Sequence, residues 1–192
     1  MRRILYSPIL GLRLFRRPWA IVIQDVRWWC ECLGEPYRGT DSFFTQFRKP
    51  EFRNLLYHRL RHAGPGARMA ARVASVFYRP EPTCRLWTDD IGEGLYIAHG
   101  VATMIGAKKV GKHCWVNQQI SIGYSDSGEG PVLEDGVRVY CGAKVLGPIT
   151  IGRNTRIGAN AVVLKDAPPD CVLAGVPARI IRRNGVRVDE PL

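Results

Sequence analysis

The chain has 192 residues, of which 46% are hydrophobic and 23% are charged. These values are close to the average for globular proteins, so they exclude a disordered chain and a polytopic membrane protein. Residues 1–80 carry 15 Lys and Arg against 5 Asp and Glu, a net of +10 out of +11 for the whole chain. This asymmetry favours contact between the amino-terminal part and an anionic partner, with a solvated basic face as the equal alternative.

Helical periodicity marks the first 80 residues. Segment 19–32 places apolar residues at three- and four-residue steps. Asp41 is predicted to cap a helix over SFFTQFR, and Pro50 to begin one over EFRNLLYHRLRH. The GPG sequence at 64–66 separates that helix from another over ARMAARVASVFY. We therefore expect three or four short helices.

The sequence indicates neither a metal site nor a membrane span. The six cysteines form no C-x-x-C pair and lack histidines at zinc-ligand spacing, so we expect reduced thiols in the cytosol. The start, MRRILYSPILGLRLFRR, mimics a signal peptide, but Pro8 and Arg13 interrupt it and no small-residue cleavage site follows. No run of about 18 apolar residues, the length that spans a bilayer, occurs. We predict a cytoplasmic protein, with peripheral contact at the inner membrane through the basic helices as a further hypothesis.

Beyond residue 90 the apolar residues recur every six positions. An 11-residue step, filled by the predicted loop YSDSGEGP, separates two series. A period of six fits short strands that alternate with tight turns, and it is typical of a parallel β-helix in which each repeat buries one aliphatic residue. A β-sandwich would instead show apolar residues at every second position. The predicted inward residues are Ala98, Met104, Val110, Val116 and Ile122, then Leu133, Val139, Val145, Ile151, Ile157 and Val163.

Small or amide residues follow five of these inward positions. They are expected to supply turn positions that tolerate positive φ. The five are Gly111, Asn117, Gly123, Gly152 and Gly158.

Residues 84–182 resemble the hexapeptide-repeat acyltransferases, and among them the serine O-acetyltransferase branch. The likeness rests on GLYIAHG, IGANAVVLKD and AGVPARII, which occur in the family's order and spacing. It implies a left-handed parallel β-helix of about five coils, with a helical region over 1–83 and a C-terminal tail over 183–192. It also implies a homotrimer that binds acetyl-CoA between neighbouring β-helices. The stretch WVNQQISIG is similar to members associated with surface polysaccharides.

His99 is the candidate catalytic residue. Moving an acetyl group to a hydroxyl requires a base and later an acid, and one imidazole can serve as both because its pKa lies near neutrality. His99 stands where the family's catalytic histidine stands, in A-H-G, and it follows the predicted inward residue Ala98, so its ring is expected to face a groove. The alternative is a turn histidine bonded to a nearby carbonyl. His113 is expected to be a surface turn residue.

Three positions depart from the serine-specific members that the chain resembles. The aspartate that orients the histidine is replaced by Cys84, which leaves Asp89, Asp90 or a main-chain carbonyl as the orienting group. The acidic residue before the histidine is Ala98, and the loop's Arg-His-Pro is Glu129–Gly130–Pro131. Partners for the ammonium and carboxylate groups of serine are thus missing, and unpaired charges are costly. We therefore predict a saccharide hydroxyl as the acceptor, with serine as the alternative.

The resemblance also assigns the acetyl-CoA site, without a metal. Small residues, Cys141, Gly142 and Ala159, would line the pantetheine channel, and the cations Lys165, Arg179 and Arg182 would lie near the nucleotide. The alternative for the small residues is plain coil packing. A rival of another class is a non-catalytic scaffold that displays the basic helices to a membrane or nucleic acid; for the enzyme we expect no nucleic acid partner.

Overall fold

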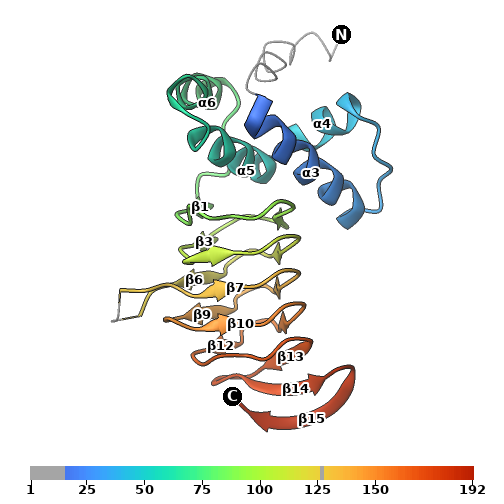
Figure 1. Cartoon of the computed structure of the whole chain (residues 1–192), viewed down its shortest axis with the longest axis vertical. Coiled ribbons are helices and arrows are strands. Elements are labelled where there is room, and N and C mark those ends of the chain that lie inside the picture. Colours follow the sequence, from blue (N-terminus) through green and yellow to red (C-terminus); the bar gives the residue numbers. More distant parts are fainter. Residues whose placement is uncertain (1–15, 126–127) are drawn as a thin grey trace. The chain divides into compact units, whose positions relative to one another are not determined.

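The computed structural model describes residues 16–125 and 128–192 and divides the chain into two compact units. The first unit ends at Pro82, and the second begins at Thr83. Helices form the first unit and short strands the second (Figure 1). Within the described part, no helix is long and apolar enough to cross a bilayer. Most of the stretch that mimics a signal peptide lies outside the described residues.

Four helices were found in the described part of the first unit, and their limits agree with the sequence prediction. Prolines begin two of them, as expected from the missing proline N–H. The predicted cap Asp41 was wrong: the N-cap is Gly39, and Asp41 lies in the first turn of its helix. The helices are α3 (Arg16–Cys32), α4 (Thr40–Phe47), α5 (Pro50–Arg61) and α6 (Pro65–Phe77).

An aromatic core and one buried ion pair hold these helices together. The Trp29 and Phe52 rings meet edge to face, with centroids 5.1 Å apart, and both side chains are almost fully buried. Arg59 of α5 donates two hydrogen bonds to the Asp25 carboxylate of α3, at 3.0 and 3.1 Å. Because both charged groups are buried, each depends on the other for its pairing.

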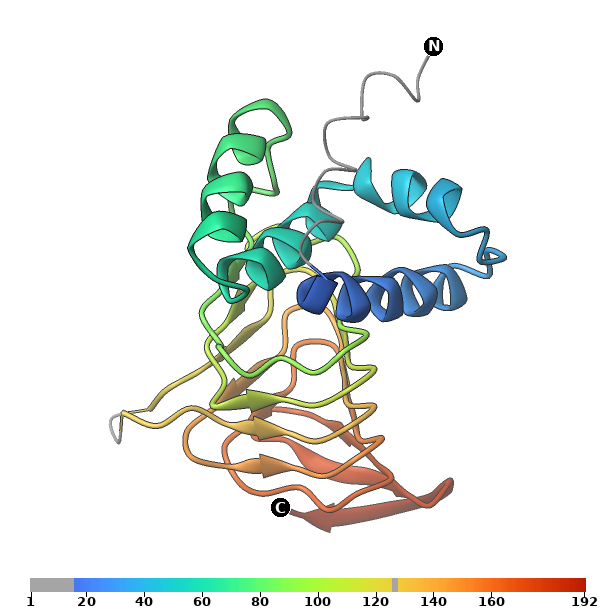
Figure 2. The same ribbon diagram turned by 45° about the horizontal axis from the view of Figure 1, so that its top comes forward.

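The second unit is a parallel β-helix, as predicted. The chain winds through three sheets in five coils, and β1 to β13 pair in parallel with the coil above or below. In sheet B the first and last coils pair only through isolated bridges, Ile91 with Val110 and Ala167 with Ile151. Figure 2 shows the coils stacked on one another. Sheet A contains β1 (Arg85–Leu86), β3 (Met104–Ile105), β6 (Ser121–Gly123), β9 (Lys144–Leu146) and β12 (Val162–Val163); sheet B contains β4 (Lys109–Val110), β7 (Val132–Leu133) and β10 (Thr150–Ile151); sheet C contains β2 (Tyr96–Ile97), β5 (Trp115–Val116), β8 (Arg138–Val139), β11 (Arg156–Ile157), β13 (Cys171–Ala174), β14 (Arg179–Arg183) and β15 (Val186–Pro191).

The last two strands close the solenoid differently. β14 and β15 pair antiparallel with β13 and with each other. The segment 183–192, assigned from the sequence as a tail, therefore supplies the end of β14 and the whole of β15.

The six-residue spacing holds for nine of the eleven predicted inward residues, from Val110 to Val163, all of which are at most 2% exposed. It fails in the first coils. Ile97 and Ile105, not Ala98 and Met104, pair with the inward residues of the next coil, and Met104 is 40% exposed. The cause is an eight-residue step from Ile97 to Ile105, followed by a five-residue step to Val110.

The residues predicted to have positive φ do not have it. Gly111, Gly123 and the other three members of that set adopt ordinary φ values. Left-handed residues instead lie three positions after an inward aliphatic residue, at two of the three corners of each regular coil. They are His113, Gln119, Gly136, Gly142, Asn154 and Asn160.

Candidate active site

The candidate site lies along one corner of the solenoid, where the chain leaves sheet C and enters sheet A. We call this edge the C–A corner; it is formed by residues 98–103, 117–120, 140–143, 158–161 and 174–175 of successive coils. Main-chain hydrogen bonds join these segments, as from Asn160 N to Cys141 O at 2.9 Å. Parallel strands lie about 4.8 Å apart, so each coil displaces its corner by that step.

His99 lies in the first coil of this corner and is exposed. Its φ of 56° is left-handed, and Ala102 in the same turn has a φ of 52°. Two residues more than in the coil below separate Ile97 from Ile105, so this turn is longer than its neighbour. The extra length, rather than the predicted inward register of Ala98, brings the imidazole to the surface.

The orienting groups considered for His99 are now placed. Cys84 immediately precedes β1 at the same corner, and its buried thiol is a weak hydrogen-bonding group. Asp89 and Asp90 follow β1 at the opposite edge of sheet A, where Asp90 lies 3.8 Å from Lys109. Within this protomer, the structure does not bring either aspartate to the corner that carries His99.

The second coil carries a polar cluster that includes Asn117, the residue after Val116, which pairs in register with Ile97 of the first coil. The indole Nε1 of Trp115 donates to Oδ1 of Asn117 at 2.6 Å, and the Tyr96 and Trp115 rings lie with centroids 4.5 Å apart. Arg138 lies over the Trp115 ring, 5.5 Å from its centroid. Gln118, the residue after Asn117, has a buried Oε1 atom that receives no hydrogen bond from the described residues. Sequence analysis did not select Gln118 as a site residue, although three successive amides at 117–119 could have marked the corner.

The small residues assigned to the pantetheine channel lie together on the C–A corner. Cys141 and Gly142 belong to the third coil, and Gly142 N donates to Gln118 O at 3.1 Å. Ala159 follows in the fourth coil and is exposed. His99 and these residues thus follow one edge of the solenoid over four coils.

The cations assigned to the nucleotide end lie at the end of the solenoid that carries β14. Arg179 of β14 pairs in register with Ala174, the corner residue of the fifth coil, and its Nε lies 2.7 Å from Asp189. Lys165 donates to the carbonyl of Leu192 at 3.0 Å. Both cations line a hollow of about 190 Å³ that Val162 and Pro191 also border. Arg182 is exposed and pairs in register with Val172, away from the corner.

The cysteines differ in exposure and chemistry. Burial raises the pKa of the Cys114 thiol to about 12, and it also raises the pKa of Cys171. Cys141 is half-buried on the C–A corner.

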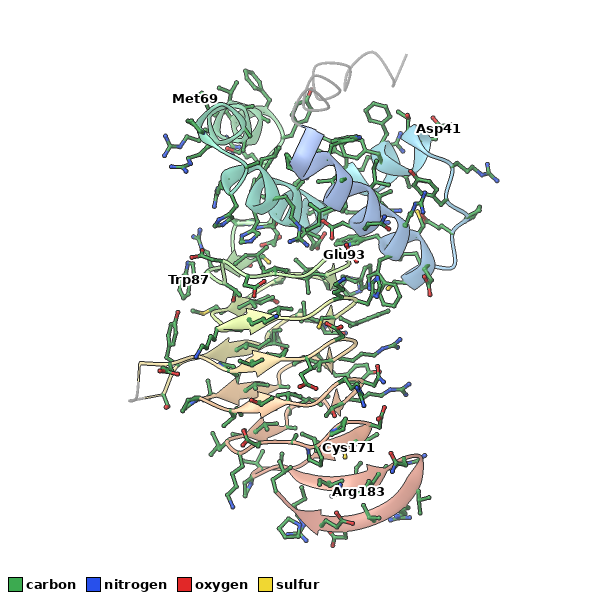
Figure 3. All side chains as sticks on the ribbon, viewed as in Figure 1. Asp41, Met69, Trp87, Glu93, Cys171 and Arg183 are labelled. Carbon is green, nitrogen blue, oxygen red and sulfur yellow. The ribbon has the colours of Figure 1, made fainter. Side chains whose placement is uncertain are left out.

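In the parts of the chain that the structure describes, no three or more His, Cys, Asp or Glu side chains form a group able to hold a metal ion. The side chain of Trp87 lies on the outside of the coils in Figure 3.

Comparison with known proteins relates the chain to one family. Residues 130–165 match the family model for bacterial transferase hexapeptide (six repeats). The serine acetyltransferase of Bacillus pumilus is 31% identical over 172 residues, covering 79% of this chain and 78% of that protein. That of Synechococcus elongatus is 47% identical over 103 residues, or 52% of this chain and 42% of the relative. That of Mycobacterium tuberculosis is 40% identical over 134 residues, or 66% and 58%.

Solved structures show the same fold. A serine acetyltransferase from Brucella abortus is 25% identical with a TM-score of 0.65, covering 99% of this chain and 76% of that chain. A structure of the Brucella abortus enzyme in complex with coenzyme A has 24% identity, a TM-score of 0.66 and coverages of 99% and 75%. The Neisseria gonorrhoeae enzyme in complex with serine has 22% identity, a TM-score of 0.66 and coverages of 94% and 75%.

Proposed function

Because the chain belongs to the bacterial hexapeptide-repeat transferase family, we propose that it is an acetyl-CoA-dependent O-acetyltransferase. The single observation that carries this proposal is the C–A corner, where exposed His99 and the small residues Cys141, Gly142 and Ala159 follow one edge of the solenoid. The relatives named serine acetyltransferases, one of them solved with coenzyme A, support the same reaction.

In the proposed mechanism, neutral His99 removes the proton from the acceptor hydroxyl as its oxygen attacks the thioester carbonyl. The tetrahedral intermediate then collapses, the carbon–sulfur bond breaks, and the imidazolium returns the proton to the departing thiolate of CoA. The exposed ring in an otherwise uncharged turn gives the acceptor access to this base.

The proposed donor site extends from His99 toward the β14 end of the solenoid. The first and fifth coils are four steps apart, or roughly 19 Å at about 4.8 Å per step. An elongated donor lying on this edge would place its thioester near His99 and its phosphates near Arg179, whose present partner is Asp189. Small side chains at the intervening coils leave room for the pantetheine arm.

Serine is the acceptor that the comparisons favour, since all three curated relatives described above are named serine acetyltransferases. This supports the alternative from the sequence analysis more than the predicted saccharide. The residues nearest His99 still favour an uncharged acceptor, because segments 98–103 and 117–120 contain no acidic or basic side chain besides His99. A saccharide hydroxyl is therefore the second candidate.

The deciding experiment follows thiol release from acetyl-CoA with serine, nucleotide sugars and oligosaccharide fragments as acceptors. His99→Ala should lower kcat by about a hundredfold to ten-thousandfold, the usual contribution of a positioned base. His113→Ala, an exposed histidine at another corner, is the matched control and should retain activity. Near-normal turnover by His99→Ala contradicts the assigned role. Serine as the best acceptor removes the saccharide candidate, and no thiol release with any acceptor supports a non-catalytic scaffold.

We also propose that three copies of the chain assemble. We further propose that α6 contacts an anionic membrane surface. On α6, Met69, Val73, Val76 and Phe77 are between 54 and 75% exposed, and the helix holds Arg68 and Arg72 but no acidic residue. Such a basic amphipathic face suits an interfacial helix. Flotation with vesicles containing phosphatidylserine should show binding that salt weakens. Absence of binding at low salt would contradict membrane contact.

A further inference from the structure

Gln118 carries a buried hydrogen-bond acceptor that the solenoid itself does not use. Its Oε1 atom is shielded from solvent, and no described residue donates to it. Buried amide oxygens in folded proteins are nearly always hydrogen-bonded, because an unpaired one has lost its water without replacement. We therefore expect its hydrogen-bond donor to be a group other than the main-chain N–H groups that join the coils.

The strand register places Gln118 beneath the turn that carries His99. Ile97 pairs with Val116, and Gln119 N donates to the carbonyl of Val101 at 2.9 Å. Between these two links, residues 98–100 of the first coil face residues 117 and 118 of the second. Adjacent coils are about 4.8 Å apart, a separation that a glutamine side chain can span. No described residue is hydrogen-bonded to that ring.

We propose that Gln118 is the positioning residue of His99. Its Oε1 accepts the N–H of the neutral imidazole, which fixes the ring and its tautomer and leaves the other nitrogen as the base. The inference rests on the proposed function, because it assumes that His99 is the base. It also accounts for Cys84: the orienting group comes from the coil below His99 instead of the position before β1.

An amide orients the ring without adding charge. The ionisable side chains on or next to this corner are Cys84 and Arg85 near the first coil and Tyr140, Cys141 and Lys144 in the third; Lys144 donates to Gln119 O at 2.9 Å. None is a carboxylate. A carboxylate at 118 would favour the imidazolium, raise the pKa of His99 and extend the protonated, inactive form to higher pH.

Two variants test the proposal against matched changes at Gln24, an exposed glutamine of α3 outside the C–A corner. Gln118→Met keeps the side-chain length but removes the acceptor, and should lower kcat about tenfold to a hundredfold with the KM for acetyl-CoA unchanged. Gln118→Glu should retain turnover at high pH and move the acid limb of kcat/KM upward by about one pH unit. Gln24→Met and Gln24→Glu should leave kcat and the acid limb close to those of the parent protein.

Nitrogen-15 NMR of the His99 ring supplies a readout that does not depend on turnover. The parent protein should show one dominant neutral tautomer, Gln118→Met a mixture of both, and Gln118→Glu a raised pKa. An unchanged tautomer ratio and acid limb in the Gln118 variants overturns the proposal. A loss of activity that occurs only together with a change in native mass also overturns it, because Gln118 would then act in packing between protomers. If His99→Ala is fully active, the proposed function itself fails; if His99→Ala is inactive while both Gln118 variants match the parent, only the positioning role fails.

Discussion

His99 owes its exposure to backbone conformation and turn length. A left-handed residue with a side chain is uncommon, and this turn contains two of them, His99 and Ala102. Regular corners of the solenoid use one, as at Gln119 or Gly142. The longer turn lifts the imidazole away from the stack, and the next coil presents Asn117 and Gln118 beneath it. A base and its neighbours are thus held by main-chain geometry rather than by a long flexible loop.

Cysteine reactivity gives a prediction at this scale. The thiolate is the reacting form, so the raised pKa of Cys114, about 12, should protect it from iodoacetamide at about pH 8. Half-buried Cys141 should react in the native protein, and acetyl-CoA should slow its labelling by covering the C–A corner. Peptide mass spectrometry measures both effects, with Cys32 of the helical unit as the control that acetyl-CoA leaves unchanged. Equal labelling of Cys141 with and without acetyl-CoA contradicts the donor site.

The role of His99 as the base stays a prediction, and the sequence did not predict its surroundings. The A-H-G motif was sufficient to select His99, whereas Asp89 and Asp90 proved to lie at the far edge of sheet A. The position of these aspartates depends on how many residues each corner contains, and a strict six-residue period cannot reveal an eight-residue step followed by a five-residue one. Gln118 was overlooked because its significance comes from the coil above it, not from its own segment.

At the scale of elements, glycines in the solenoid allow the main chains of neighbouring coils to approach closely. A Cβ added to Gly111 would lie 2.6 Å from Asp135 N and from Glu134 C, which are backbone atoms of the next coil. Gly111 N also donates to Leu133 O at 2.8 Å. The glycine therefore permits the close approach of two main chains, although its φ is ordinary.

Gly111→Ala should consequently destabilise the solenoid. Overpacking of this kind costs about 1 to 3 kcal/mol, because backbone rather than a flexible side chain must move. Chemical denaturation monitored by circular dichroism measures the change. Gly123→Ala is the matched control, since nothing lies within 4 Å of its added Cβ, and its effect should stay within about 0.5 kcal/mol. Equal stabilities of the two variants would refute the close-approach explanation.

Among the elements, helices and strands were predicted more securely than their caps and turns. Pro50 and the GPG sequence located α5 and α6 because proline restricts the start of a helix. The cap at Gly39 could not be foreseen, since aspartate is a preferred capping residue but Asp41 lies two residues beyond the cap, in the first turn of the helix. Positive φ was misplaced because glycine was taken as the marker, while His113, Gln119, Asn154 and Asn160 carry many of these positions.

For the whole molecule, large apolar side chains remain uncovered on the outside of the solenoid. Val101 is 51% exposed, Tyr124 and Leu164 are each 54% exposed, and Trp87 is 58% exposed. Val101 belongs to the same turn as His99. Exposed apolar side chains near a candidate site are consistent with an interface between copies of the chain.

Native mass spectrometry should therefore find three copies of the 21.6-kDa chain. Val101→Asp should shift this population toward monomer and lower turnover, because a charge at an apolar interface loses its hydration. Val186→Asp, at a residue 66% exposed on β15, is the control and should remain trimeric. A monomeric parent protein with full activity would contradict the assembly.

The fold class was accessible from sequence because the repeat is long and regular: nine inward residues from Val110 to Val163 are at most 2% exposed. The strand structure of segment 183–192 could not be predicted from the sequence. Its residues lack the six-residue period, and β15 is defined by antiparallel pairing with β14 rather than by its own pattern.

The stacked coils have a further consequence for donor recognition. The height of the stack changes only in whole steps of about 4.8 Å, because each coil is hydrogen-bonded to its neighbours. Deleting one complete coil between the His99 turn and β14 would shorten the span by one increment and leave each remaining corner intact. In the proposed donor site, the number of coils would therefore set the distance between His99 and Arg179.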